Sequence, residues 1–198
     1  SPAPVVTPDI HAKVMREVIR PTVKGLAAEG VRYTGFLYAG LMIMKKPDGS
    51  TDVRVLEFNC RMGDPETQPI MMRIRSDFAA VVDAAIDGKL DQTEIEWDRR
   101  SALGVVVASR GYPMKPEKGA VIEKLPADTE VTHVFHAGTK IDDDGLTIVN
   151  GGRVLCVVGL GESLAQAKKT AYEAAHQVVF DGMQMRSDIG HRALGAKA

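Results

Sequence analysis

The chain has 198 residues, long enough for one large domain or two small ones with a real hydrophobic core. Hydrophobic residues make up 44% and charged residues 26%, and the net charge of −1 gives no electrostatic footprint for nucleic acid or anionic lipid. No apolar run approaches the roughly 20 residues that cross a bilayer. From the net charge we expect no nucleic-acid partner, and from the lack of a long apolar run we expect no membrane partner. Cys60 and Cys156 lie far apart without metal-ligand spacing, and no signal peptide opens the chain, which indicates free thiols in a cytoplasmic protein.

The first ninety residues combine helical and strand-like patterns. Thr7 suits an N-cap and Pro8 the first position of a helix that ends near Gly30, while Pro21 inside this pattern should kink or split the helix. Residues 34–44 and 52–58 predict a β-hairpin, joined by turn residues 46–50. A polar loop follows over 60–66, then a helical pattern over about 66–74, then a helix that Ser76 would cap and Gly88 would end.

The second half of the chain is richer in strands. Residues 91–100 are charged and form the predicted domain boundary, beyond which β-like runs cover 102–108, 120–125, 131–139, 146–149 and 153–160. Ser163 should cap a helix that covers these strands. The pattern predicts an α+β protein with a first domain over 1–90, a linker over 91–100 and a second domain over 101–198.

Three glycine-rich or acidic segments have simple structural interpretations. Gly159 and Gly161 follow a strand and precede a helix, but the third glycine of a dinucleotide fingerprint is absent, so we expect a plain strand–turn–helix junction. Residues 150–152 (Asn-Gly-Gly) are typical of a hairpin turn, and a substrate-facing role for this loop with Arg153 is the alternative. Residues 142–145 (Asp-Asp-Asp-Gly) predict a solvated turn rather than a calcium loop.

The most informative stretch for chemistry runs from Val55 to Thr67. Glu57 and Asn59 are two apart on a predicted strand and should project from the same face, while Leu56 and Phe58 take the other face and can anchor the strand in the core. A carboxylate beside an amide carbonyl supplies two hard oxygen ligands for Mg²⁺. Arg61 could stabilise a transferring phosphoryl group or fork onto a carboxylate. For the bare pair the structural alternative is that Asn59 caps the turn and Glu57 is solvated.

The longer motifs resemble a known family. Residues 35–41 (Gly-Phe-Leu-Tyr-Ala-Gly-Leu), 57–69 (Glu-Phe-Asn-Cys-Arg-Met-Gly-Asp-Pro-Glu-Thr-Gln-Pro), 135–140, 150–155 and 188–190 are similar to the phosphoribosylamine–glycine ligase family of ATP-grasp enzymes. The resemblance implies that the chain carries the C-terminal part of an ATP-grasp domain, as an antiparallel hairpin plus helices, followed by a small mixed α/β C-terminal domain. The N-terminal part of such an enzyme, with its glycine-rich lid and most nucleotide-binding residues, would be missing from this chain.

The resemblance also implies a reaction and roles for individual residues. ATP, glycine and 5-phosphoribosylamine would give glycinamide ribonucleotide, ADP and phosphate through a glycyl phosphate. Glu57 and Asn59 would hold Mg²⁺ or Mn²⁺, Arg61 would be the catalytic residue, and Asp64, Glu66 and Arg153 would bind substrate. For Asp64 and Glu66 the alternative is a loop cap ahead of a helix. The chain would supply the metal-binding end of the site and be inactive alone.

Two other functions remain open from the sequence. One is another ATP-grasp carboxylate–amine ligase or carboxylase, against which residues 63–67 (Gly-Asp-Pro-Glu-Thr) and 150–155 count. The other is a non-catalytic binding or assembly module that keeps the fold without turnover. Whether the protein extends upstream of Ser1 distinguishes an enzyme fragment from such a module.

Overall fold

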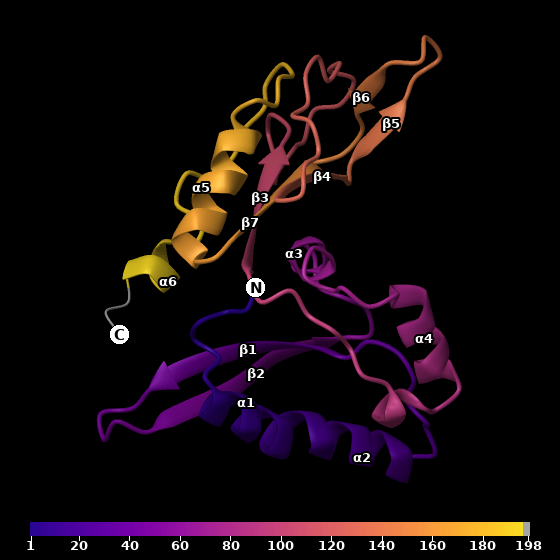
Figure 1. Ribbon diagram of the computed structural model, residues 1–198, viewed down its shortest axis with the longest axis vertical. Helices are drawn as coiled ribbons and strands as arrows, with labels where there is room; N and C mark the ends of the chain where they lie inside the picture. The colour runs from indigo at the N-terminus through magenta and orange to yellow at the C-terminus, as the bar shows by residue number, and fades with distance from the viewer. Residues whose placement is uncertain (196–198) are drawn as a thin grey trace. The chain divides into compact units, whose positions relative to one another are not determined.

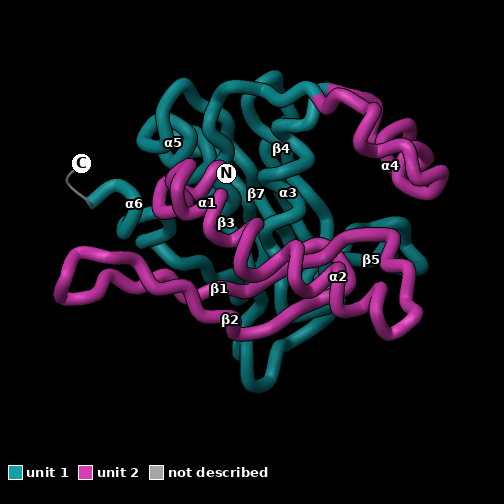
Figure 2. The backbone as a smooth tube through the Cα atoms, turned by 90° about the horizontal axis from the view of Figure 1, so that it is seen from below, with its two compact units in different colours: residues 1, 64–75, 96–198 teal, residues 2–63, 76–95 magenta. Residues whose placement is uncertain are grey.

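The computed structural model describes residues 1–195, which form two compact units, shown in different colours in Figure 2. Unit 2 consists of Pro2–Gly63 and Ser76–Ile95. Unit 1 consists of Ser1, Asp64–Arg75 and the chain from Glu96 onward. The α+β class is confirmed, because both units combine helices with antiparallel strands. The predicted first domain, 1–90, differs from unit 2, since Ser1 and residues 64–75 belong to unit 1 and residues 91–95 of the predicted linker belong to unit 2.

Unit 2 begins with a helical segment that passes through the proline instead of breaking at it. Helix α1 (Pro8–Val14) has Thr7 as its N-cap, as predicted, with the Thr7 hydroxyl accepting from the Ile10 N–H at 3.4 Å. A π-helical turn (Met15–Ile19) then leads into α2 (Arg20–Ala28). Proline cannot donate the helical hydrogen bond, and the wider turn before Pro21 absorbs the misfit. The segment ends before Gly30, whose φ is 83°.

The predicted hairpin is confirmed as β1 (Tyr38–Lys45) paired with β2 (Thr51–Asn59). The first strand starts four residues later than the apolar run. The turn closes as expected, with Gly49 at φ 81° and the Ser50 N–H bonded to the Asp48 carboxylate at 2.8 Å. The helical segment runs along this hairpin (Figure 1), and the Lys13 ammonium donates to the Thr51 carbonyl at 2.6 Å.

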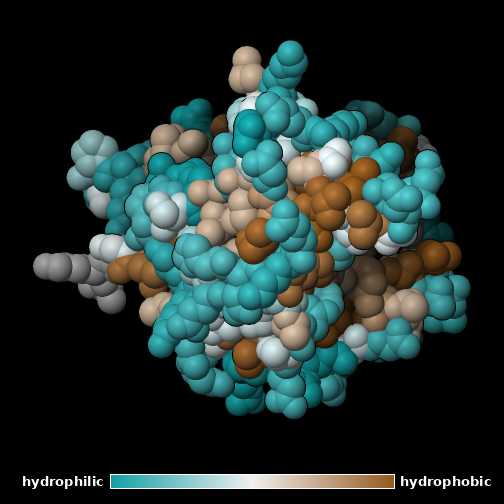
Figure 3. Space-filling model, turned by 90° about the horizontal axis from the view of Figure 1, so that it is seen from above, coloured by the Kyte–Doolittle hydropathy of each residue, from teal (hydrophilic) through white to brown (hydrophobic). Residues whose placement is uncertain are grey.

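One face of this hairpin is not covered in the described chain. Leu56 is 64% and Phe58 43% exposed, so the expectation that they anchor the strand in a core is wrong for this structure. Among the described residues of unit 2, only Val18 is a buried hydrophobic side chain. Strand alternation assigned the correct face to these residues but could not say whether anything packs on it. Hydrophobic residues also gather in patches on the face of the molecule in Figure 3.

Helix α4 (Phe78–Ile86) completes unit 2, together with a short 3₁₀ turn (Leu90–Gln92). Its N-cap is Asp77 rather than the predicted Ser76, because the Asp77 carboxylate reaches the N–H groups of Ala79 at 2.9 Å and Ala80 at 3.3 Å. The helix ends ahead of Gly88, at φ 71°, as predicted.

Unit 1 is built on a three-stranded antiparallel sheet in the order β3 (Ser101–Ala108), β7 (Arg153–Gly161), β4 (Thr132–His136). Helix α5 (Leu164–Ala175), capped by Ser163 as predicted, covers one face, and α3 (Thr67–Met71) packs on β3 and β7. A small sheet of β5 (Thr139–Ile141) and β6 (Thr147–Val149) and a terminal helix α6 (His191–Gly195) complete the unit.

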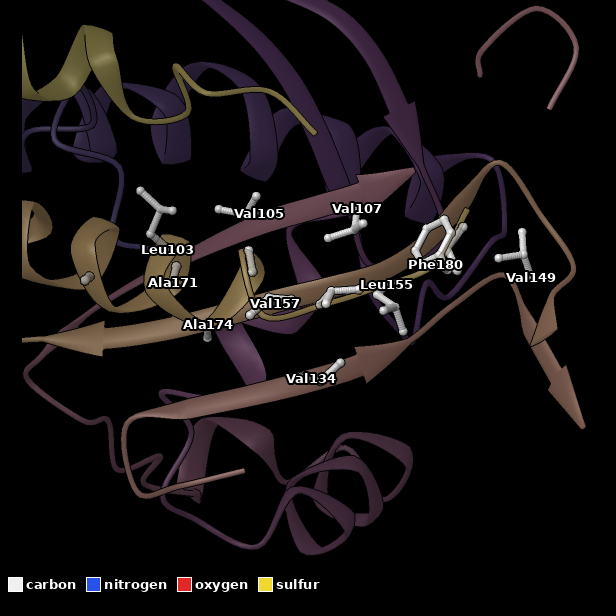
Figure 4. Close-up of a cluster of buried hydrophobic side chains, with 14 residues drawn as sticks. Leu103, Val105, Val107, Val134, Val149, Leu155, Val157, Ala171, Ala174 and Phe180 are labelled. Atoms are coloured by element: carbon white, nitrogen blue, oxygen red, sulfur yellow. The ribbon is translucent and has the colours of Figure 1, made fainter. Parts of the chain in front are cut away.

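Side-chain alternation along the sheet of unit 1 separates two apolar clusters. Figure 4 shows the larger one, in which side chains from β3, β4, β7 and α5 point toward one another: Leu103, Val105, Val107, Val134, Leu155, Val157, Ala171 and Ala174. The smaller cluster holds the intervening residues Ala102, Cys156, Val158 and Leu160, with Met72 beside them. A strand buried on both faces is why β7 reads as a nearly continuous apolar run.

Two predicted segments of unit 1 differ from the structure. Residues 120–125 form an extended segment with isolated bridges at Val121 and Lys124 rather than a strand, because successive residues bond to different neighbours. The loop 150–152 is not a hairpin turn, since β6 pairs with β5 while β7 pairs with β3 and β4. The turn at 142–145 is as predicted, with the Asp142 carboxylate accepting from the Leu146 N–H at 2.8 Å.

The glycines at the end of β7 explain the strand–helix junction. A Cβ at Gly159 would lie 2.4 Å from the Ala171 nitrogen, and one at Gly161 would lie 2.4 Å from the Ala167 nitrogen. The bare backbone therefore lets α5 approach the sheet closely. The interpretation of this stretch as a structural junction is confirmed. No helix of the described residues is long and apolar enough to cross a membrane.

Candidate active site

The end of β2 presents two oxygen-bearing side chains on one face. The Asn59 amide nitrogen donates to a Glu57 carboxylate oxygen at 3.2 Å, which confirms that the two project together. Gly40 lies opposite Glu57 across the hairpin, and a Cβ there would come within 2.9 Å of the Glu57 side chain. Glycine at position 40 therefore leaves the space that the carboxylate occupies.

The donor set at this strand end fits a hard divalent cation. The exposed carboxylate and the amide oxygen of Asn59 are the ligand types that Mg²⁺ takes, and two protein groups suffice where phosphates and water complete the shell. Within the described chain, no group of three or more His, Cys, Asp or Glu side chains could hold a metal by itself. A metal at Glu57 and Asn59 would therefore depend on oxygens from a bound ligand.

Arg61 follows the strand with an exposed guanidinium. One of its terminal nitrogens donates to the Met62 carbonyl at 2.9 Å. This contact holds the side chain close to its own loop. A guanidinium in this position can still offer a forked pair of donors to a carboxylate or phosphate.

A second group of predicted residues comes together in unit 1. The Arg153 guanidinium donates to the Asp64 carboxylate at 2.8 Å, although the two residues are 89 positions apart. A second nitrogen of Arg153 lies 3.4 Å from the Tyr112 hydroxyl. These residues line a shallow pocket of about 460 Å³, together with Pro113, Pro116, Ala137, Gly138 and Gly152.

Glu66 is not part of this pocket. It is exposed and directly precedes α3, but its side chain makes no capping hydrogen bond. Glu66 thus occupies the N-cap position of α3 without a capping hydrogen bond from its side chain, and the Asp64 carboxylate binds Arg153. The structure brings together Asp64 and Arg153 and leaves Glu66 apart from them.

Cys156 lies beneath this region on β7 and is chemically inert there. Burial raises the pKa of its thiol to about 12, and the negative charge of Asp64 adds to the effect. The thiol is therefore protonated near neutral pH and supplies no nucleophile. Both cysteines are free, as predicted.

Tyr112 and Gly138 are the site residues that sequence patterns missed, whereas Gly152 belongs to the loop for which a substrate-facing role with Arg153 was the alternative. Gly111-Tyr112-Pro113 signals only a turn, and nothing in it indicates a contact with Arg153, 41 residues away. A Cβ at Gly138 would lie 2.6 Å from the Arg153 carbonyl oxygen, and one at Gly152 would lie 2.4 Å from the Tyr112 ring. These close approaches explain glycine at both positions.

Comparison with known proteins identifies the class. Two family models match, "Phosphoribosylglycinamide synthetase, ATP-grasp (A) domain" over residues 1–67 and "Phosphoribosylglycinamide synthetase, C domain" over residues 102–192. The hairpin with its strand-end oxygens and the following α+β unit therefore define part of an ATP-grasp protein and its C domain.

Curated relatives and a solved structure agree with this class. The chain is 58% identical to phosphoribosylamine–glycine ligase of Ralstonia nicotianae over 98% of its length, and 57% identical to that of Vibrio parahaemolyticus. It covers 45% and 44% of these relatives, so it spans less than half their length. The crystal structure of phosphoribosylamine–glycine ligase from Thermotoga maritima matches with a TM-score of 0.76 at 40% identity, covering 89% of this chain and 42% of that one. The chain belongs to the phosphoribosylamine–glycine ligase family.

A more distant neighbour shares the fold alone. The biotin carboxylase domain of 2-oxoglutarate carboxylase from Hydrogenobacter thermophilus has a TM-score of 0.58 at 14% identity, over 93% of this chain and 39% of that one.

Proposed function

We propose that this chain is part of an enzyme that joins glycine to 5-phosphoribosylamine in purine biosynthesis, at the expense of ATP. The observation that carries the proposal is 58% identity to a phosphoribosylamine–glycine ligase across 98% of the chain. In the proposed reaction the γ-phosphoryl group of ATP moves to the glycine carboxylate, giving glycyl phosphate and ADP. The amine nitrogen then attacks the carbonyl carbon, phosphate leaves, and the nitrogen loses a proton.

We assign the metal end of the site to Glu57 and Asn59. Their oxygens would hold Mg²⁺ or Mn²⁺, which neutralises phosphate charge during the transfer. The 3.2 Å contact between their side chains supports the assignment, as does Gly40, whose missing side chain leaves room for that of Glu57. ATP use follows from the ATP-grasp class of the matched domain. The cytoplasmic location stays a prediction.

Arg61 is the proposed catalytic residue and Asp64, Glu66 and Arg153 the proposed substrate-binding residues. The Arg61 guanidinium would stabilise charge on the acyl phosphate, because phosphoryl transfer depends on positioning and charge neutralisation. The pocket in which Asp64 and Arg153 meet supports a binding role for that pair. Glu66 is also proposed to bind substrate, because its side chain is exposed and it lies two residues after Asp64 in the sequence.

The experiment is a chimaera in which this chain replaces the matching 194-residue segment of the Ralstonia nicotianae relative. We expect release of ADP that depends on both glycine and 5-phosphoribosylamine, with glycinamide ribonucleotide as product. The unmodified relative is the control. A folded chimaera that hydrolyses ATP without ligation, or that accepts a different carboxylate or amine, contradicts the proposal.

A further inference from the structure

We propose that the pocket around Arg153 in unit 1 binds a 5-phosphoribosyl group, with Arg153 on the phosphate and Asp64 on the ribose hydroxyls. The inference rests on the proposed function, which supplies a phosphoribosyl substrate without saying where it binds. It adds Tyr112 as a positioning residue. The ligand class follows from the charges and the size of the pocket.

Arg153 is the cation of the pocket and already lies in a pre-arranged geometry. Among the residues that line the pocket it alone is basic, and its side chain is 41% exposed. Asp64 holds one terminal nitrogen at 2.8 Å, and the Tyr112 hydroxyl lies 3.4 Å from the other. Contacts at both ends fix the plane of the guanidinium, which reduces the entropy lost when it grips a phosphate. An ammonium group could not provide this forked recognition.

Asp64 gives the pocket a second kind of recognition. An ionised carboxylate accepts hydrogen bonds only, so its neutral partners are donors such as sugar hydroxyls. It would repel a free phosphate bound directly against it. A ligand that carries hydroxyls at one end and phosphate at the other satisfies both charged groups. A pentose phosphate has this arrangement, whereas glycine lacks the hydroxyls.

The walls of the pocket are shaped by close packing of the chain on itself. Gly138 and Gly152 let the backbone pack directly against the Arg153 carbonyl oxygen and the Tyr112 ring, where side chains would collide. Pro113 and Pro116 add rigid apolar surface suited to the C–H face of a sugar ring. The volume of about 460 Å³ lies within the range of small-ligand pockets.

The test is titration calorimetry of the 198-residue chain with ribose 5-phosphate, ribose, inorganic phosphate, AMP and glycine. We expect ribose 5-phosphate to bind more tightly than ribose or phosphate. Arg153→Met should weaken this binding roughly tenfold or more, as expected for lost charge-assisted bonds. Arg99→Met is the matched control, since Arg99 is exposed in the same unit and lies outside the pocket. Thermal unfolding of each variant checks that it is folded.

Two further variants separate the roles. Asp64→Asn should weaken ribose 5-phosphate binding more than phosphate binding, whereas loss of an Asp64 that only restrains Arg153 would weaken binding of both equally. Tyr112→Phe removes the hydroxyl and keeps the ring, and should weaken ribose 5-phosphate binding about threefold, an effect of one neutral hydrogen bond. Equal effects of Arg153→Met and Arg99→Met overturn the proposal.

The remaining outcomes also bear on whether the pocket binds a phosphoribosyl group. No binding of ribose 5-phosphate by the folded chain overturns the proposal, as does tighter binding of AMP that depends on Arg153, which would make the pocket a nucleotide site. The ligation assay of the chimaera is independent of these titrations. An active chimaera with no ribose 5-phosphate site in this chain leaves the proposed function standing and removes the inference. A chimaera that does not ligate, together with a chain that binds ribose 5-phosphate, contradicts the proposed function and leaves the phosphoribosyl site standing.

Discussion

Asp98 is a buried carboxylate whose charge is stabilised by neighbouring arginines. Arg100 grips it with its Nε at 3.1 Å and a terminal nitrogen at 2.7 Å, and Arg75 lies 3.6 Å away. The hydrogen bonds from Arg100 hold the pKa of Asp98 at about 2. Because the pKa is lowered on folding, the ionised group stabilises the fold above the unfolded pKa near 4, and this contribution is lost as the pH falls toward 2.

We therefore expect Asp98→Asn to lower the free energy of unfolding by about 2 kcal/mol at pH 7 and by little near pH 2. Urea unfolding at several pH values measures the difference between variant and wild type. This difference removes the separate pH dependence of Asp188, whose pKa Arg186 also lowers to about 2. Asp91→Asn, at an exposed position, is the control. A stability difference that does not change with pH would contradict the assignment.

Glu57 carries the metal prediction. In the chimaera, Glu57→Ala should raise the Mg²⁺ concentration needed for half-maximal ligation, because one of two protein oxygen ligands is lost. Its side chain is exposed, so thermal stability should change little. Activity titrated against Mg²⁺, with Glu94→Ala as an exposed control, measures this. An unchanged Mg²⁺ requirement would remove Glu57 from the metal site.

For Arg61, we expect that even lysine cannot substitute. A forked guanidinium can make two parallel bonds to a carboxylate or phosphate, and an ammonium cannot. Arg61→Lys in the chimaera should cost at least about 2 kcal/mol in transition-state stabilisation, read from kcat/KM. Arg54→Lys on β2, the strand that precedes Arg61, is the control, since the Arg54 guanidinium is already paired with Asp52 at 2.8 Å. Near-wild-type turnover of Arg61→Lys would refute the role.

Replacing either of two glycines by alanine should change the stability of the fold, in opposite directions. Gly159→Ala places a methyl group 2.4 Å from the Ala171 backbone nitrogen, so α5 must shift from the sheet at a cost of about 1–3 kcal/mol. Gly25 lies inside α2 with nothing within 4 Å of its would-be Cβ, so Gly25→Ala should stabilise by about 0.5–1 kcal/mol. Chemical denaturation of both variants tests the pair. Stabilisation by Gly159→Ala would show that the helix does not pack as described.

For the chain as a whole, we expect no ligation and weak or no ATP binding when it is purified alone. The residues proposed for the metal and substrates are present, but no glycine-rich lid that cradles phosphates is found among these 198 residues. The exposed apolar face of β2 should also bind a hydrophobic dye. Calorimetry with Mg-ATP and a phosphate-release assay measure the first point. Tight ATP binding with steady turnover would contradict it.

The sequence predicted most of the local elements because their signals are local. Thr7 and Ser163 cap helices through bonds to N–H groups three residues away, and Glu57 and Asn59 share a face because strand geometry repeats every two residues. The errors at this level are small shifts, such as Asp77 in place of Ser76, where two adjacent residues both suit a cap.

Contacts between distant segments could not be predicted in this way. Asp64 and Arg153 were each expected to bind substrate, but their 2.8 Å contact arises because the α3 segment and β7 belong to one unit. Tyr112 joins them through the same packing. The loop 150–152 has the composition of a hairpin turn, yet its flanking strands pair elsewhere, since strand pairing depends on partners far along the chain.

The sequence by itself determined the class of fold, the family and the strand-end pair of Glu57 and Asn59. Periodicity, caps and a long specific motif are properties of neighbouring residues and need no knowledge of packing. Only the tertiary structure decided which residues meet at the Arg153 pocket and that Leu56 and Phe58 are uncovered. Burial and long-range contact depend on what packs against a face, and a single segment of sequence does not contain that information.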